Sequence, residues 1–138
     1  MDEDKRKLIG SKRRDLFKQR HKSLAGGFYA CDLDFVWIQR RPPCILAVLD
    51  SKRPGERPTF SEVITYNSLL ALGIPVFLVE YVGDSEVEGL DRLTVFRYLG
   101  GDPYPPQSPS QSEHVAGPFS WEEFGKWQAS FREQHQQA

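Results

Sequence analysis

The short run Cys44–Asp50 constrains the fold of this chain more than any other segment. Every residue in it is apolar except the last. A run of this length without polar alternation is typical of a strand that is buried on both faces. The chain is therefore expected to contain a covered central sheet, with an aspartate at the end of one of its inner strands.

Neighbouring segments predict the other strands. From Phe28 to Gln39 the sequence is rich in aromatic and β-branched residues, which predicts a long strand. The proline-containing turn at 40–43 would join it to the Cys44–Asp50 strand as a hairpin. Further strands are predicted at 75–82 and 93–99, so the sheet is expected to have about four strands.

Helices are predicted around this sheet. Residues 1–22 form a basic segment that is expected to be helical. Thr59 and Glu62 have the spacing of a capping box, which predicts a helix that crosses over between the hairpin and the strand at 75–82. A second capping-box spacing predicts a final helix at 120–135, and the Gly-, Pro- and Ser-rich segment 100–119 is predicted to be a loop. The expected fold class is α/β, with a mixed sheet flanked by helices in one domain, 1–138.

Charge is unevenly distributed along the chain. The formal net charge is −1, yet residues 4–22 contain nine Lys or Arg residues and two acidic residues. A basic segment on an otherwise acidic chain is typical of a surface that contacts a phosphate backbone, although a solvated helix face has the same pattern. DNA is the expected partner, and the candidate contacts are Lys12, Arg13, Arg14, Lys18, Arg20 and Lys22.

The two cysteines, Cys31 and Cys44, lie in apolar surroundings and are interpreted as small buried hydrophobic residues. Their number indicates neither a disulfide framework nor a Cys/His zinc site. The apolar runs are too short to cross a bilayer, and the charged N-terminus shows no secretory signal. We therefore expect a cytoplasmic protein without a membrane partner.

Two aspartates stand out because of their apolar surroundings. Asp34 and Asp50 lie within or at the end of predicted strands, where an unpaired carboxylate would cost several kcal/mol. Residues two apart in a strand share a face, so Lys52 would lie beside Asp50, and Asp32 beside Asp34. Carboxylates from two paired strands could meet around Mg²⁺ or Mn²⁺, for which oxygen ligands are preferred.

The arrangement of Asp34 followed by Asp50-Ser51-Lys52 resembles the PD-(D/E)XK nuclease superfamily, over roughly residues 23–82. The resemblance implies a restriction-endonuclease-like core and a magnesium-dependent site. Asp34 or Asp32 and Asp50 would bind the cation, together with the backbone carbonyl of Ser51. Lys52 would be the catalytic lysine. Many members carry a polar residue and a tyrosine four apart on the crossover helix, a pattern matched here by Glu62 and Tyr66.

These observations predict a metal-dependent nuclease that hydrolyses DNA phosphodiester bonds. A homodimer or a targeting protein partner would be compatible with so small an enzyme. The alternative is a non-catalytic module on a nuclease fold, which binds nucleic acid or a protein. A third interpretation takes residues 32–34 as the metal site of a sugar-nucleotide transferase, but it leaves Asp50 and Lys52 unexplained.

Overall fold

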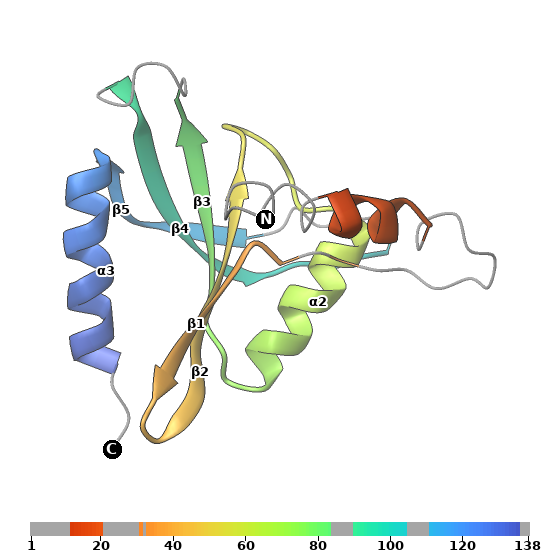
Figure 1. The fold of residues 1–138 in the computed structure, drawn as a ribbon, viewed down its shortest axis with the longest axis horizontal. Helices are drawn as coiled ribbons and strands as arrows, with labels where there is room; N and C mark the ends of the chain where they lie inside the picture. Colours follow the sequence, from red (N-terminus) through yellow and green to blue (C-terminus); the bar gives the residue numbers. More distant parts are fainter. Residues whose placement is uncertain (1–11, 21–30, 32, 84–89, 105–110, 136–138) are drawn as a thin grey trace, which may run out of the picture.

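The computed structural model describes residues 12–20, 31, 33–83, 90–104 and 111–135, which form an α/β fold (Figure 1). Residues 12–20 form an exposed helix. The elements that follow are β1 (Phe35–Arg40), β2 (Pro43–Lys52), α2 (Phe60–Ala71), β3 (Val76–Val82), β4 (Arg92–Gly100), β5 (Gln111–Phe119) and α3 (Trp121–His135).

The strands form a mixed sheet in the order β1-β2-β3-β4-β5. Strand β2 pairs antiparallel with β1 and parallel with β3, and the remaining neighbours are antiparallel. Helix α2 is the connection between the parallel strands β2 and β3, as predicted. Residues 46–50 of β2 are buried without interruption, which confirms that this strand lies inside the sheet.

Helices α2 and α3 cover opposite faces of the sheet (Figure 1). On the α3 face, Phe131 packs with buried residues of β2, β3 and β4, and Trp127 and Phe124 lie against the same cluster. On the α2 face, Tyr66 packs with Val48, Val76, Leu78 and Tyr98. The sheet therefore has a separate apolar core on each side, and from Ala47 onward successive residues of β2 face different helices.

Helix α2 begins and ends as its sequence predicts. The Thr59 side chain accepts a hydrogen bond from the Glu62 backbone, and the Glu62 side chain accepts one from the Thr59 backbone, which completes the capping box. Gly73, just beyond the last turn, has a φ of 80° that favours glycine. Ser120 and Glu123 form the same reciprocal pair of hydrogen bonds at the start of α3.

The predicted long strand from Phe28 is wrong in the part that the structure describes. Strand β1 begins at Phe35, and Asp34 lies exposed in a bend before it. The backbone N–H of Asp34 donates to the Asp50 side chain, so it is not available for a ladder hydrogen bond. Residues 28–30 and Asp32 lie outside the described residues.

The predicted loop at 100–119 is wrong in its second part, because Gln111–Phe119 is strand β5 and the sheet has five strands in the described chain, whereas residues 101–104 have no regular secondary structure. Strand β5 lies at the edge of the sheet, and its pairing with β4 is irregular. Pro118 is tolerated there, because an edge strand need not donate from every N–H. A side chain at Gly117 would approach the carbonyl oxygen of Leu93 to 2.4 Å, so the glycine allows the strands to come close.

None of the helices in the described residues is both long enough and apolar enough to cross a membrane.

Candidate active site

Asp50 lies near the end of β2 and is buried beneath α2, with 2% of its surface exposed. Its Oδ1 accepts a hydrogen bond of 2.7 Å from the backbone N–H of Asp34. Its Oδ2 accepts a hydrogen bond from the hydroxyl of Tyr66. Both oxygens of this buried carboxylate are therefore held in place, one by the chain that enters β1 and the other by helix α2.

Asp34 lies beside Asp50 at the same end of the hairpin. Its Oδ2 accepts hydrogen bonds of 2.7 Å from both the backbone N–H and the hydroxyl of Ser51. Its Oδ1 has no hydrogen-bond partner among the described residues. The prediction placed Asp34 inside an apolar strand, and the structure instead places it on the surface, in a bend before β1.

Lys52 projects from β2 on the same side as Asp50, as the two-residue period of a strand requires. Its Nζ lies 2.5 Å from Glu62 Oε2 and 3.4 Å from Glu56 Oε2. The lysine side chain is 5% exposed, so nearly all of it is removed from solvent. Burial of a charged lysine is costly unless the charge is paired, and Glu62 supplies the nearer partner.

Glu62 has two structural roles. Its Oε1 accepts from the backbone N–H of Thr59 at 2.9 Å, which caps the helix. Its Oε2 accepts hydrogen bonds from Lys52 Nζ and, at 3.1 Å, from the hydroxyl of Tyr66. The glutamate is therefore both the third residue of the capping box and a support for the lysine.

The electrostatics of this network follow from burial and pairing. Burial raises the pKa of Asp50 above its ordinary value, and the hydrogen bonds from Tyr66 and Asp34 only partly oppose the rise. Burial alone would lower the pKa of Lys52, but its hydrogen bond and charge interaction with Glu62 outweigh burial and raise the pKa. The reverse holds for Glu62: burial would raise its pKa, but Lys52 and the Thr59 backbone together lower it.

Tyr66 links these groups. It is fully buried, and burial together with the carboxylates of Asp50 and Glu62 raises the pKa of its hydroxyl. The tyrosine is therefore a neutral donor between two carboxylates. Its ring lies edge-on to that of Tyr98, with centroids 5.1 Å apart.

Two further residues, Cys31 and Asn67, lie near this network. Cys31 is half-buried, and burial raises the pKa of its thiol, with smaller effects from Thr65, Glu62, Asp50 and Lys52. Its position near the site is a tertiary property that its apolar neighbours in sequence do not reveal. Asn67 follows Tyr66 in α2. Its side-chain amide donates a hydrogen bond to the carbonyl of Gly101, which follows β4, and accepts one from the N–H of the same residue.

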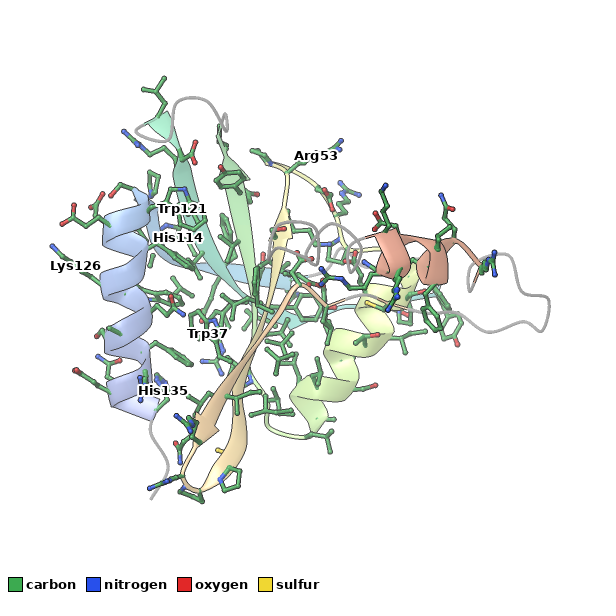
Figure 2. All side chains as sticks on the ribbon, in the orientation of Figure 1. Trp37, Arg53, His114, Trp121, Lys126 and His135 are labelled. Atoms are coloured by element: carbon green, nitrogen blue, oxygen red, sulfur yellow. The ribbon has the colours of Figure 1, made fainter. Side chains whose placement is uncertain are left out.

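The structure places the candidate residues in two groups. Asp34, Asp50, Ser51, Lys52, Glu62 and Tyr66 form one connected network between the end of β2 and the start of α2. The basic residues at 12–20 lie on the separate exposed helix. Lys22 and Asp32 lie outside the described residues. In Figure 2, Arg53 marks the loop that leaves β2 directly after Lys52.

Within the described residues there is no group of three or more His, Cys, Asp or Glu side chains arranged to hold a metal ion. Mg²⁺ commonly uses one or two carboxylates and completes its octahedron with water and substrate oxygens. The free Oδ1 of Asp34, the adjacent carboxylate of Asp50 and the Ser51 carbonyl are donors of this hard, oxygen-only type. The residues present therefore fit a magnesium or manganese ion.

Comparisons of the chain with protein-family models, with curated proteins and with solved structures gave no match.

Proposed function

We propose that this chain is a metal-dependent nuclease of the PD-(D/E)XK type, which hydrolyses DNA phosphodiester bonds. The observation that carries the proposal is the convergence of Asp34, Asp50 and Lys52 at one end of the β1–β2 hairpin. A carboxylate and an ammonium group that are both almost fully buried impose a cost on folding, which a catalytic role would explain.

Asp34 and Asp50 are the proposed ligands of Mg²⁺ or Mn²⁺, with the backbone carbonyl of Ser51. When bound, such an ion would stabilise the charge that develops on the phosphate and would help to activate water. Ser51 also orients Asp34 through its N–H and hydroxyl. The resemblance leaves Asp32 as a further candidate ligand.

Lys52 is the proposed catalytic lysine. Its pairing with Glu62 keeps it protonated, so it would place a positive charge against the phosphate oxygens and stabilise the additional charge of the transition state. Glu62 and Tyr66 are positioning residues in this proposal, because they contact Lys52 and Asp50. The resemblance left open whether Glu62 is a metal ligand, a substrate contact or only part of the capping box. The two filled oxygens of Glu62 favour a support.

The DNA backbone is the proposed partner of the exposed basic helix, through Lys12, Arg13, Arg14, Lys18 and Arg20. Contacts of this kind hold phosphates without reading sequence, and they weaken as salt concentration rises. A restriction-endonuclease-like core would suit this chemistry, because the hairpin and the crossover helix jointly form the site. Selection of a cleavage position could then come from DNA structure, from a homodimer or from a targeting protein.

The deciding experiment is cleavage of labelled linear, nicked and branched DNA in Mg²⁺ or Mn²⁺, with Asp50→Asn and Lys52→Ala beside the wild type. We expect products that need the metal and are lost in both variants. Glu122→Gln on the outer face of α3 is the control, since its carboxylate is 82% exposed and forms a surface pair with Lys126. Inactivity of the folded wild type on every substrate would favour the non-catalytic module instead.

A separate measurement tests the cation without relying on activity. Mg²⁺ should raise the melting temperature of the wild type, because an ion that binds only the folded chain stabilises it by mass action. Asp34→Asn and Asp50→Asn should each reduce that shift, and Glu122→Gln should keep it. An equal shift in all four proteins would place the ion elsewhere.

A further inference from the structure

A groove runs between the edge strand β1 and helix α3, on the face of the sheet opposite α2. It consists of three adjoining hollows of about 490, 640 and 300 Å³. The first two share Trp37 and Gln128, and the second and third share Ile38, Leu46 and Arg132. Trp37 lies between β1 and α3 in Figure 2. The hollows therefore adjoin one another along β1 and α3.

The first hollow begins at the candidate active site. Ser51, which bonds Asp34, is one of its lining residues, and so is Phe35, the next residue after Asp34. Half of the other lining residues are aromatic, namely Trp37, Tyr81, Trp121 and Phe124. Phe35 is 65% exposed, so its ring presents an apolar surface to solvent beside the polar site.

The far hollow has a different character. It lies at the tip of the β1–β2 hairpin and is lined by Arg40, Arg41 and Arg132 together with Ile38, Gln39 and Leu46. No acidic residue lines it, and none of the three arginines forms an ion pair in the described part of the chain. Three guanidinium groups around one concavity repel one another, and an anion would relieve that repulsion.

The length of the groove suits a short stretch of nucleic acid. Strand β1 spans Phe35–Arg40, which corresponds to roughly 17 Å at the usual rise of a strand. About five stacked nucleotides cover that distance at the ~3.4 Å spacing of one DNA strand. Bases stack on exposed aromatic side chains only when they are unpaired, because in a duplex their faces are covered by neighbouring bases.

We infer that this groove binds single-stranded DNA, with an unpaired base against Phe35 and the aromatic walls beside Asp34, and a backbone phosphate in the arginine hollow. The inference rests on the proposed nuclease function, whose substrate class it narrows to DNA with an unpaired segment. The strand would reach the candidate site from the α3 side, past Ser51. The basic helix at 12–20 is not required for this contact.

The test is fluorescence anisotropy of a labelled twelve-nucleotide oligothymidylate and of a blunt twelve-base-pair duplex, in EDTA and over a series of salt concentrations. The single strand should bind more tightly than the duplex. Phe35→Ala should weaken single-strand binding by roughly 5- to 150-fold, the range expected for loss of one stacked base. The double variant Arg40→Gln/Arg132→Gln should lower the salt slope by about 0.7, which is the contribution of one lost phosphate contact for a single strand.

Matched controls lie outside the groove. Lys126→Gln removes a positive charge from the same helix as Arg132, and Leu72→Ala removes an apolar side chain that is 76% exposed, compared with 65% for Phe35. Both should bind as the wild type does. The inference is overturned if the groove variants and the controls bind alike, or if the duplex binds as tightly as the single strand. It is also overturned if Phe35→Ala dissociates a dimer in sedimentation without changing DNA binding, because β1 would then pair with a second copy.

Cleavage of the same oligonucleotide in Mg²⁺ separates this inference from the proposed function. If Asp50→Asn abolishes cleavage but the groove variants cleave normally, the nuclease is supported and the groove inference fails. If the groove variants lose binding but the wild type cleaves nothing, the groove inference holds and the nuclease proposal fails.

Discussion

Lys52 Nζ lies 2.5 Å from Glu62 Oε2, although the lysine belongs to strand β2 and the glutamate to helix α2. The same glutamate closes the capping box through its other oxygen. The start of the helix and the position of the lysine are consequently fixed by one side chain. The Lys52–Glu62 pair is therefore expected to stabilise the fold, and its contribution to the free energy of unfolding can be measured without any substrate.

Replacing Glu62 by Gln should reduce the free energy of unfolding by about 2 kcal/mol. The substitution removes the nearer negative partner of Lys52 while the charged lysine side chain stays buried. Glu56→Gln is the matched variant. It removes a partner of the same lysine whose side chain is 41% exposed, compared with 16% for Glu62, so a loss below about 1 kcal/mol is expected. Urea unfolding measures both. Equal losses would show that the Glu62 pair contributes no more than a surface pair.

Asp50→Asn should stabilise the chain at neutral pH, because burial raises the pKa of Asp50 in the folded state. A carboxyl group with a raised folded pKa stabilises the fold fully below its unfolded pKa, and that stabilisation is lost as pH rises through the folded pKa. The advantage of the variant should therefore be greatest at neutral pH and disappear in acid, below the ordinary pKa of 3.8.

Urea unfolding of the wild type and Asp50→Asn over this pH range, without divalent cations, measures the effect. Glu122→Gln is the control, since its carboxylate is exposed. A variant that is less stable than the wild type at neutral pH would show that the hydrogen bonds to Asp50 outweigh its burial.

Patterns that are local in the sequence predicted their elements correctly. Residues 46–50 of the apolar run at 44–50 are buried in β2, although Ile45 is exposed, and both capping boxes start the helices that they predict. The hairpin and the crossover helix followed from the same patterns. Each depends on residues a few positions apart, so a single sequence contains the necessary information.

What the sequence did not reveal depends on contacts between distant segments. Strand β5 has weak alternation and contains Gly117 and Pro118, and it is a strand because β4 offers a free edge. Asp34 appeared to lie within an apolar strand, but its bonds to Asp50 and Ser51 hold it in the bend before β1. Residues two apart in a strand or four apart in a helix could be placed on one face from the sequence. The individual hydrogen bonds between different strands and helices could not be deduced.

Asn67→Ala should destabilise the chain by about 2 kcal/mol, because the amide bonds both polar groups of the Gly101 backbone and accepts from the Tyr98 hydroxyl. Asn67→Asp keeps an acceptor for the Gly101 N–H and for Tyr98 but faces the Gly101 carbonyl with a second acceptor. Its cost should be reduced at acid pH, where the carboxyl group is protonated. Thermal unfolding at two pH values checks both expectations. An Asn67→Asp variant with the same deficit at both values would contradict this account.

The hydroxyl of Tyr66 should be energetically coupled to Asp50, because it donates to the buried Oδ2 and has Glu62 as its other acceptor. Tyr66→Phe should cost about 2 kcal/mol in the wild type, since it leaves one oxygen of a buried carboxylate without its donor. In the Asp50→Asn background the cost should be smaller by at least about 1 kcal/mol.

A double-mutant cycle measured by urea unfolding provides that coupling energy. Tyr98→Phe is the matched control, because its ring is equally buried and its hydroxyl bonds Asn67 rather than Asp50. Its effect should add to that of Asp50→Asn within about 0.5 kcal/mol. Additivity in both cycles would mean that Tyr66 contributes mainly through packing against Tyr98. Coupling in the Tyr66 cycle alone would identify its hydroxyl as the group that holds Asp50 at the end of β2.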